Sequence, residues 1–339
     1  MRWEGRIEYA LGDPERTAVA IDKLSFSMKT TQSRPEVAVL MATYNGAGFL
    51  LQQLDSIVAQ SLTDWTIWAS DDSDDDTTWN VLKQYQERIG GSKLHLQKGP
   101  QKGFVDNFLS LVCQANIEAD YFAYCDQDDV WEVEKLSRAI QWLADIQQNV
   151  PALYCSRTRL VDEQNNEIGL SPLFSKPPSF ANALVQNIGG GNTMVFNRAA
   201  RSLLMQAGAD LSLISHDWWT YIVVTGCGGQ VRYDTKPSLR YRQHHLNLIG
   251  HNSNWFARMT RLKMLWNGHL SASNDKHLAA LKRISKRIVP MNLIILNELS
   301  LARGMCLARR LKAFRRTGIH RQTSLGNLGL FAAAFFNKI

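Results

Sequence analysis

The sequence is poor in cysteine, and the cysteines it has are not arranged in pairs. Its 339 residues contain five, an odd number, and none shows a CxxC spacing. This pattern argues against a disulfide framework and against a structural zinc site, because both need organised sets of cysteines. It favours a reducing compartment. The five are Cys113, Cys125, Cys155, Cys227 and Cys306.

Long apolar runs are also missing. The sequence has no stretch of about 20 consecutive apolar residues, so we expect no membrane span. The first residues lack the apolar core of a signal peptide, and we therefore expect a cytoplasmic protein. A hydrophobic content of 45% and a charged content of 20% are typical of a globular protein. The length allows one large domain or two.

Acidic residues are nearly absent from the last quarter of the chain. Residues 257–339 contain 16 lysines and arginines but only two acids, Asp275 and Glu298. This segment carries a net charge of +14, which leaves −7 on residues 1–256 and +7 in total. An acidic front and a basic end suggest two different tasks. Residues 1–27 differ in character from the rest of the chain, and we expect an extension there, with Met28 as a possible true start.

Apolar runs alternate with helical periodicity through the first half. We expect strands at 37–42, 65–69, 93–97 and 121–125, and helices around 50–58, 77–88, 104–115 and 132–148. Strands that alternate with helices indicate βαβ units and a mostly parallel sheet. Polar clusters follow three of these strands, at 43–45, 71–72 and 126–129. The carboxyl ends of parallel strands share one edge of a sheet, where open α/β sheets bind ligands.

The acidic cluster after the fourth strand is the most informative. Asp126 and Asp128 are two residues apart, so on an extended strand they would share a face. Two carboxylates on one face suit a hard divalent cation, Mg²⁺ or Mn²⁺, that also holds a diphosphate. The alternative is a helix N-terminus, with Asp129 capping a helix that starts near Glu132.

Six motifs, in order along the chain, resemble those of family 2 glycosyltransferases. They are VAVLMATYNG, SDDSDDDT, KGFVDNF, DQDDVW, HDWW and YRQH, and they cover about residues 36–250. The last three together resemble the rhamnosyltransferase-like branch. Ser73 stands where the family usually has glycine. The resemblance implies the α/β fold called GT-A, a Rossmann-like and mostly parallel sheet flanked by helices, here with a C-terminal basic helical extension.

The resemblance also implies a nucleotide-sugar site. A uracil or thymine ring offers an N–H donor and carbonyl acceptors, so Asp71 can accept and the Thr43 backbone can donate. The alternative for this cluster is a solvated turn, which we adopt for Asp74–Asp76 only. Lys102 is expected near the diphosphate, although a solvated loop lysine fits equally well. The nucleotide-binding candidates are Thr43, Tyr44, Asn45, Asp71, Asp72, Lys102, Gly103, Asn107 and Asp126.

Three further groups complete the expected site. Asp126, Asp128 and His244 are the candidate metal ligands. Asp217 of HDWW is the candidate catalytic base, because inverting transfer needs one group to take the acceptor's proton; the alternative is an N-cap aspartate. Weaker candidates for contact with acceptor, donor sugar or diphosphate are Asp129, Trp131, Gly190, Gly191, Asn192, His216, Trp218 and Arg242. His245 is a weaker metal candidate, and 189–192 fits a flexible turn as well.

Basic and apolar residues interleave at helical spacing over 252–316. This pattern suits amphipathic helices on an anionic membrane surface, at the inner face of the cytoplasmic membrane and close to a lipid-linked acceptor. The alternative is a solvated face of helices packed on the domain. We expect no nucleic-acid partner, because no recognised motif accompanies the charge. The expected division is 1–35 tail, 36–130 nucleotide-sugar half, 131–250 acceptor and catalytic half, and 251–339 basic helices.

These observations predict a metal-dependent inverting glycosyltransferase. The resemblance favours transfer of L-rhamnose from dTDP-L-rhamnose to a glycan acceptor, in synthesis of a bacterial surface polysaccharide such as O-antigen or capsule. One alternative is transfer of another sugar from a UDP-sugar. Others are a nucleotidyltransferase, which expects a basic phosphate loop that residues 43–48 lack, and a non-enzymatic membrane-surface adaptor, which leaves the acids without a purpose.

Overall fold

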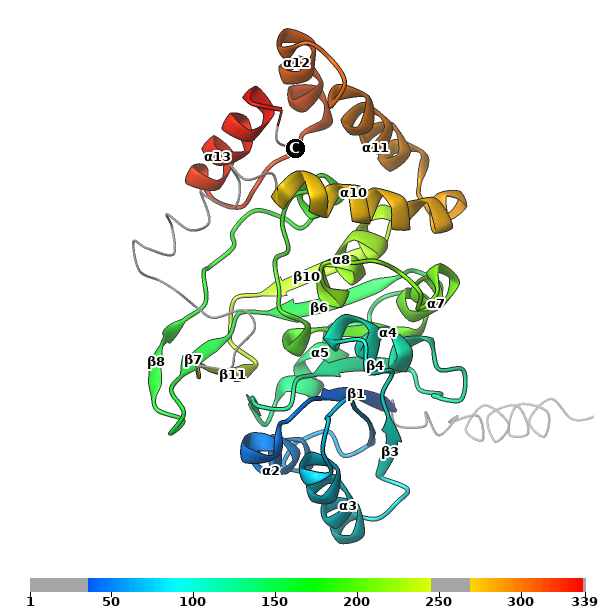
Figure 1. Ribbon diagram of the computed structural model, residues 1–339, viewed down its shortest axis with the longest axis vertical. Helices are drawn as coiled ribbons and strands as arrows, with labels where there is room; N and C mark the ends of the chain where they lie inside the picture. Colours follow the sequence, from blue (N-terminus) through cyan, green and yellow to red (C-terminus); the bar gives the residue numbers. More distant parts are fainter. Residues whose placement is uncertain (1–35, 245–268, 338–339) are drawn as a thin grey trace, which may run out of the picture. The chain divides into compact units, whose positions relative to one another are not determined.

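A computed structural model describes residues 36–244 and 269–337. Its centre is a seven-stranded sheet with the order β10-β6-β9-β4-β1-β2-β3 (Figure 1). Four strands of the first half run parallel, as the sequence predicts. They are β1 (Val37–Thr43), β2 (Trp65–Asp71), β3 (Leu94–Lys98) and β4 (Tyr121–Cys125).

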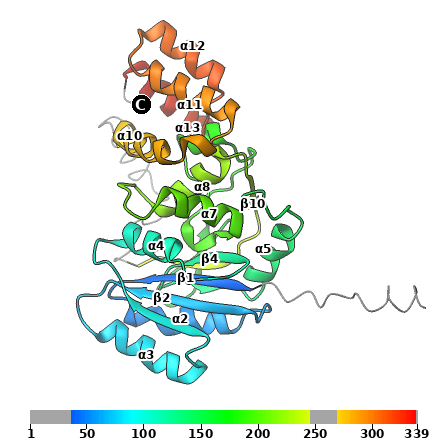
Figure 2. The same ribbon diagram turned by 90° about the vertical axis from the view of Figure 1, so that its right-hand side faces the viewer.

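The sheet is covered by helices on both faces, which explains the unbroken apolar run of β1. Val37, Val39 and Met41 pack in one hydrophobic cluster, and Ala38 and Leu40 pack in another. The first cluster includes side chains of α2 (Ala47–Val58), α3 (Thr77–Ile89) and α5 (Lys135–Leu143). The second includes α4 (Phe104–Cys113), α7 (Arg198–Ala207) and α8 (His216–Gly226). Figure 2 shows the two helix layers on either side of the strands.

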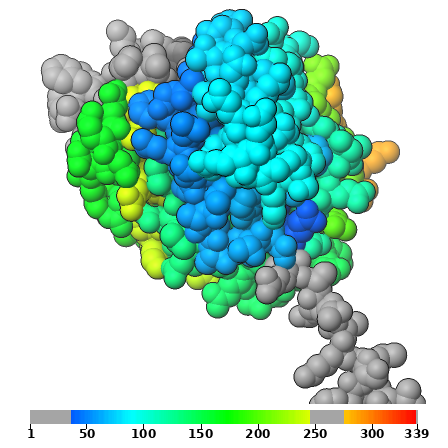
Figure 3. Space-filling view, turned by 90° about the horizontal axis from the view of Figure 1, so that it is seen from below, coloured from blue at the N-terminus to red at the C-terminus, as the bar shows by residue number. Residues whose placement is uncertain are grey.

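The second half adds strands of both directions. β6 (Ala152–Ser156) and β10 (Gln230–Asp234) are parallel to each other, and β9 (Val195–Asn197) runs antiparallel to β4 and β6. A second sheet has the order β5-β11-β7-β8. Its members are β5 (Val130–Trp131), β11 (Leu239–Arg242), β7 (Arg159–Val161) and β8 (Glu167–Leu170). Two short helices lie between β8 and β9 in the chain: α6 (Phe180–Ala183) and the 3₁₀ helix η1 (Gly191–Thr193). Figure 3 shows one face of the molecule, with the residues of the first strands and helices, coloured blue to cyan, at its centre.

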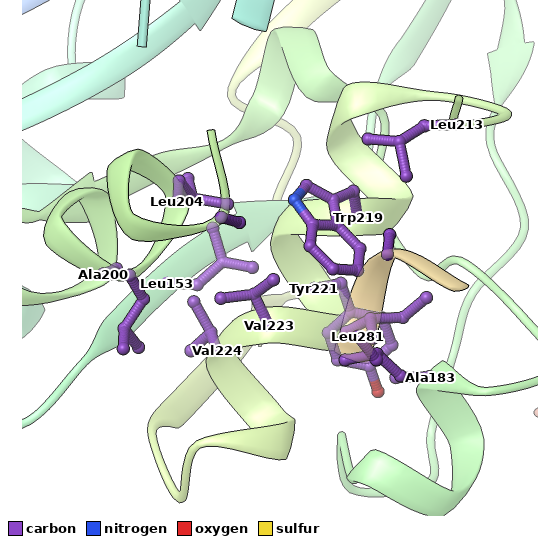
Figure 4. Packing of buried hydrophobic residues seen from close by; sticks show 14 of the residues in the cluster. Leu153, Ala183, Ala200, Leu204, Leu213, Trp219, Tyr221, Val223, Val224 and Leu281 are labelled. Carbon is purple, nitrogen blue, oxygen red and sulfur yellow. The ribbon is translucent and has the colours of Figure 1, made fainter. Parts of the chain in front are cut away.

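The basic end of the chain is helical where the structure describes it. Its helices are α10 (His269–Leu281), the 3₁₀ helix η2 (Lys282–Arg287), α11 (Pro290–Ala302), α12 (Leu307–Thr317) and α13 (Ser324–Phe335). Leu281 packs in the same buried cluster as Ala183, Trp219 and Tyr221 (Figure 4). No helix among the described residues is long and apolar enough to cross a membrane. Residues 252–268 of the expected helical stretch, like His245, lie outside the described residues, and the expected division of the chain stays a prediction.

The segment after the acidic cluster differs from the prediction. Val130 and Trp131 form strand β5, paired with β11, and the helix begins only at Lys135. Its N-cap is Glu134, and Asp129 is fully buried. The interpretation of Asp129 as a helix cap is therefore wrong. A pairing partner more than a hundred residues away causes this difference, and local sequence carries no signal of it.

Candidate active site

The topology brings the ends of several elements to one edge of the main sheet. β1, β2, β3 and β4 are parallel, so their carboxyl ends share that edge. Because β9 runs the opposite way, η1, which precedes it, reaches the same edge; Val195 of β9 pairs with Ala123 of β4. The polar residues at 43–45, 71–72, 126–129 and 191–193 are thus gathered together, as the sequence predicts for the first three groups.

The ends of β1 and β2 are joined through Asp71. This buried carboxylate accepts hydrogen bonds at Oδ1 from Thr43 Oγ1 (2.9 Å) and Ser73 Oγ (2.6 Å). Ser73 Oγ in turn accepts a hydrogen bond from the Asn45 backbone N–H (2.9 Å). The serine that stands in place of the family's usual glycine therefore stabilises the turn after β1. Asp71 Oδ2 is buried without a hydrogen-bond partner in the described chain, and Lys98 Nζ lies 3.7 Å away. It is therefore a buried acceptor at the sheet edge that can take a further hydrogen bond.

Asp72 anchors the loop between β3 and α4. Its Oδ1 accepts from the Gln101 backbone N–H (2.8 Å), and burial raises the pKa of this carboxyl. A Cβ at Gly99 would lie 2.1 Å from Asp72 Oδ1 and 2.9 Å from Asn107 Oδ1, so only glycine fits there. Gly103 has a φ of 94°, and Lys102 is exposed. The candidates Asp72, Gly103 and Asn107 therefore lie together, whereas Lys102 projects from the loop.

A glutamine that the sequence analysis did not single out links the first and fourth strands. Gln127 Oε1 accepts from the Tyr44 backbone N–H (2.8 Å), and Gln127 Nε2 donates to the Tyr44 carbonyl (2.9 Å). The Tyr44 ring is exposed, and its hydroxyl donates to Asp74 Oδ2 (2.8 Å). The second residue of the DQDDVW motif thus fixes the turn that carries Tyr44 and Asn45.

The carboxylates after β4 have different surroundings. Asp128 Oδ2 lies 2.8 Å from His244 Nε2, so the structure brings two candidate metal ligands into contact. Burial raises the pKa of Asp126, and the nearby negative charges of Asp128 and Asp217 raise it further. Asp129 is fully buried and accepts from Asn192 Nδ2 (2.6 Å). It supports η1 through this hydrogen bond.

The donor set fits a divalent cation that arrives with a diphosphate. Within the described ranges, no group of three or more His, Cys, Asp or Glu side chains is arranged to hold a metal by itself. The Asp128–His244 pair, with Asp126 beside it, supplies one or two carboxylates and an imidazole. Mg²⁺ is commonly held in this way, by one or two carboxylates and the phosphates of the substrate, and carboxylate and imidazole ligands also suit Mn²⁺.

Two of the weaker candidates are buried and already bound within the protein. The Arg242 guanidinium donates to the carbonyls of Asp128 (3.0 Å) and Glu163 (2.6 Å) and to Gln52 Oε1 (2.6 Å). Trp131 is buried, and Lys135 Nζ lies 3.6 Å from its ring centre. We therefore revise the expected ligand contacts of Arg242 and Trp131 to positioning roles; Arg242 holds the backbone of the aspartate that contacts His244.

Asp217 lies in the first turn of α8 and is held by a loop facing it. Its Oδ2 accepts from Asn187 Nδ2 (3.0 Å) and from the Gly191 backbone N–H (3.1 Å). Its Oδ1 accepts from the Trp218 backbone N–H (2.7 Å). The N-cap position belongs to Ser215, so the alternative of Asp217 as the N-cap is wrong. Asn187, which the sequence analysis missed, has no motif that would reveal it.

His216 and Gly191 pack directly against each other beside the carboxylate. The His216 ring is buried and stacks on Phe108 with ring centres 3.8 Å apart. A Cβ at Gly191 would lie 2.4 Å from His216 Nε2 and 3.3 Å from Asp217 Cβ. Gly191 is therefore required for close approach of η1 to α8. Gly190 precedes this turn and accepts, through its carbonyl, from Thr193 Oγ1 (2.8 Å).

Replacing Gly191 with alanine tests this packing. The stacked, buried imidazole has no free space, so we expect the turn to move and its N–H to leave Asp217. Because the sequence predicts Asp217 as the base of a glycosyl transfer, we expect the transfer rate to fall at least about tenfold, with little change in nucleotide binding. Gly48→Ala is the matched control, because a Cβ there meets nothing within 4 Å. Equal rates for the two variants would contradict this packing argument.

Lys135 is a buried lysine at the base of the site. Its ammonium donates to the Asn192 carbonyl. Burial lowers its pKa to about 7, against the opposing effect of the charges of Cys125, Asp129 and Asp126. Asn192 is therefore held by two hydrogen bonds. Its backbone carbonyl accepts from Lys135, and its side-chain amide donates to Asp129. The position of η1, and with it the Gly191 N–H, depends on the contacts of Lys135 and Asp129 with Asn192.

Trp218 connects α8 to the C-terminal helix α10. Its indole Nε1 donates to the Ala183 carbonyl (2.6 Å), and its ring makes an edge contact with His277 of α10, with centres 4.7 Å apart. His277 is buried, as is His216. Burial lowers the pKa of each of these histidines from 6.5 to about 4.

Acid should therefore destabilise the fold through these two histidines. The unfolded chain binds a proton at each as the pH falls below 6.5, whereas the folded chain does so only near pH 4. The contribution of each histidine to stability is fully present above pH 6.5. It is lost between pH 6.5 and 4, by at most about 1.4 kcal/mol per pH unit for each histidine. Urea unfolding of wild type and His277→Gln at about pH 7.5 and about pH 5 measures this. An equal loss in both proteins would contradict the assignment to His277.

Comparison with known proteins agrees with the geometry. A model of glycosyl transferase family 2 matches residues 38–205. The chain is 30% identical over 241 residues to the dTDP-rhamnosyl transferase RfbG of Shigella flexneri, across 67% of this chain and 79% of that protein. It is 28% identical over 111 residues to the putative glycosyltransferase EpsE of Bacillus subtilis strain 168, across 33% and 39%. S. aureus TarS 1–349, solved in complex with UDP-GlcNAc, superposes with a TM-score of 0.52 at 14% identity, covering 89% of each chain.

The chain is thus a glycosyltransferase with the GT-A fold. It belongs to glycosyltransferase family 2, and among the proteins it resembles is the rhamnosyl transferase RfbG. The expected family and fold are confirmed. Family membership also decides against the nucleotidyltransferase and the non-enzymatic adaptor as the chain's main activity.

Proposed function

We propose that this glycosyltransferase moves L-rhamnose from dTDP-L-rhamnose to a glycan acceptor, with inversion at the anomeric carbon. The observation that supports dTDP-L-rhamnose as the donor is the 30% identity to a dTDP-rhamnosyl transferase over 79% of that protein's length. No described residue is assigned to a sugar hydroxyl, so the donor rests on this relationship. The site supports the reaction class through its nucleotide edge, its acidic cluster and its single oriented base.

The nucleotide lies, in this proposal, across the ends of β1 and β2. Asp71 Oδ2 accepts the ring N–H of the base, because it is a buried acceptor with no other hydrogen bond in the described chain. The backbone at Thr43 and the exposed Tyr44 ring border the base, with Asn45 beside them. Asp72 Oδ2 and Asn107 Oδ1 are also buried acceptors without partners there, and they suit the ribose hydroxyls. Lys102 and Gly103 lie on the diphosphate side.

Asp126, Asp128 and His244 are the proposed ligands of Mg²⁺ or Mn²⁺. The contact between Asp128 and His244 supports this assignment, since a carboxylate and an imidazole suit such a cation. When bound, the cation neutralises charge on the leaving diphosphate. Arg242 contributes by holding the Asp128 carbonyl.

Asp217 is the proposed general base. Asn187 and Gly191 both donate to Oδ2, which fixes the carboxylate beside Asp126. It takes the proton of the acceptor hydroxyl as that oxygen forms a bond to the anomeric carbon. The bond from that carbon to dTDP breaks on the opposite side, and dTDP leaves. A β-linked donor therefore yields an α-linked product. Gly190–Asn192, His216 and Trp218 border the place where acceptor and sugar meet.

The acceptor we propose is a glycan carried on a lipid-linked intermediate of a bacterial surface polysaccharide, at the inner face of the cytoplasmic membrane. An acceptor anchored in lipid would meet the enzyme at that surface. The acidic edge and the basic C-terminal helices would then serve different partners, the metal-bound donor and the membrane.

Release of nucleoside diphosphate tests the donor. Purified protein with Mn²⁺ is incubated with dTDP-L-rhamnose, UDP-glucose and UDP-GlcNAc, with and without a lipid-linked glycan fraction from bacterial membranes. We expect acceptor-stimulated release from dTDP-L-rhamnose, at least about tenfold faster than from the UDP-sugars, a difference of about 1.4 kcal/mol in transition-state binding. Faster release from a UDP-sugar would replace rhamnose with a hexosyl or N-acetylhexosaminyl donor. No release from any donor under these conditions would contradict the proposal.

A further inference from the structure

Helix α13 is apolar on two opposite faces, and only one of them is covered. Leu330, Ala333 and Ala334 are buried against the rest of the protein. Leu325 and Leu328 are 61% and 67% exposed, and Phe331 and Phe335 are also exposed. The spacing of these four residues places them along one side of the helix. The helix contains no charged residue. An exposed apolar stripe of this kind marks a surface that contacts something less polar than water.

The neighbouring helix α12 presents positive charge to solvent. Arg309, Lys312, Arg315 and Arg316 are exposed on it. A fifth basic residue, Arg310, is buried and donates to the Ala334 carbonyl of α13 (2.9 Å) and to the Met305 carbonyl (2.8 Å). Arg310 therefore fastens the basic helix to the apolar one. Over the described residues 269–337, twelve lysines and arginines stand against two acidic residues.

We propose that α12 and α13 form a docking surface for an anionic lipid leaflet. The α13 stripe of Leu325, Leu328, Phe331 and Phe335 enters the boundary between headgroups and acyl chains, and the basic side chains of α12 pair with lipid phosphates. Helices that combine an apolar face with basic residues bind membrane surfaces in this way, and lysines and arginines near an anionic leaflet add to the attraction.

Length and charge favour this occupant over others. A helix of 12 residues is about 18 Å long, too short for a hydrocarbon core of about 30 Å, so α13 lies in the interface and does not span it. A second copy of the chain is disfavoured as the cover, because it would bring two strongly basic surfaces together. An anionic leaflet instead matches both the apolar and the basic residues. The inference is independent of the donor sugar proposed above.

Vesicle flotation of the full chain tests the surface. We compare vesicles of phosphatidylcholine with about 40% phosphatidylglycerol, which gives a strongly anionic surface, with pure phosphatidylcholine. Wild type should float with the anionic vesicles. The double variant Leu328→Glu with Phe335→Glu should lose at least about tenfold in vesicle affinity. Arg309→Gln with Lys312→Gln should also weaken binding, and salt should reduce wild-type binding.

Matched controls separate this surface from general effects. Ile168→Glu on β8 changes another exposed apolar residue, 57% exposed, and should float like wild type. Binding of dTDP by the Leu328→Glu, Phe335→Glu variant should be unchanged, so failure of the donor proposal and of this one would be seen separately. No flotation of wild type, or equal flotation of the α13 variant, would overturn the proposal. So would a wild-type dimer in light scattering that the α13 variant converts to monomer, because a second copy would then cover the stripe.

Discussion

Replacing Asp217 with asparagine should reduce glycosyl transfer by about 10² to 10⁴-fold, the range for loss of a general base. The asparagine oxygen can still accept the Gly191 and Asn187 hydrogen bonds at 3.1 and 3.0 Å, so the loop should keep its place. The hydrogen bond from the Trp218 backbone N–H to Oδ1 is lost, because the amide nitrogen cannot accept it. What the variant loses is the ability to take the acceptor's proton. The measurement is the initial rate of transfer at saturating donor and acceptor.

The same variant should leave nucleotide binding almost intact, because Asp217 is placed on the acceptor side. Asp210→Asn is the matched control: it removes an exposed carboxylate that lies earlier in the chain. That control should transfer at the wild-type rate. If Asp217→Asn retained more than about a tenth of the wild-type rate, a different group would be the base.

Replacing Lys135 with methionine should reduce stability by about 1 to 3 kcal/mol, the range for leaving a buried hydrogen-bond acceptor without its donor. Lys135 is fully buried. Burial lowers its pKa to about 7, and the neighbouring acidic groups of Cys125, Asp129 and Asp126 oppose this change. Without it, the buried Asn192 carbonyl loses its donor. Transfer should also fall, because η1 carries the Gly191 N–H that orients Asp217.

Urea unfolding at neutral pH measures the stability effect. Lys83→Met is the matched control, since Lys83 also lies over a tryptophan ring, at 5.8 Å from its centre, but is exposed. Its effect should be below about 1 kcal/mol. A Lys135→Met effect as small as that of Lys83→Met would show that Lys135 does not support η1.

The sequence was enough for the parts of the fold that local patterns determine. The first strand was expected at 37–42 and is Val37–Thr43, and the fourth was expected at 121–125, where β4 lies. Both are buried on two faces and are continuous apolar runs in the sequence. The polar clusters that follow them are gathered at one edge, because parallel pairing alone requires it.

Features that depend on distant pairing were not predictable. The helix expected at 132 begins at Lys135, because Val130 and Trp131 pair with β11. Arg242 was expected to face phosphate, but it is buried against the carbonyls of Asp128 and Glu163. Lys135, Asn187 and Gln127 were not singled out by any sequence pattern. Only the fold shows that a helical lysine supports the turn facing Asp217.

The site residues themselves remain predictions that the structure makes specific. It brings Asp128 to His244 and holds Asp217 by the Gly191 backbone N–H. The apolar stripe of α13 adds a prediction that the basic composition of 257–339 suggested only in part. The sequence indicated charge there, whereas exposure of Leu325 and Leu328 needed the packed helices.

The measurement that tests the central claim most directly is calorimetric binding of dTDP and UDP, each with and without Mn²⁺. It should be made on wild type, Asp128→Ala and Asp217→Asn. We predict Mn²⁺-dependent binding that favours dTDP, is lost in Asp128→Ala and is kept in Asp217→Asn. That result would place the metal and nucleotide at the ends of β1, β2 and β4 and separate them from the base. Binding of neither nucleotide to wild type, or equal binding by Asp128→Ala, would contradict the account of this edge.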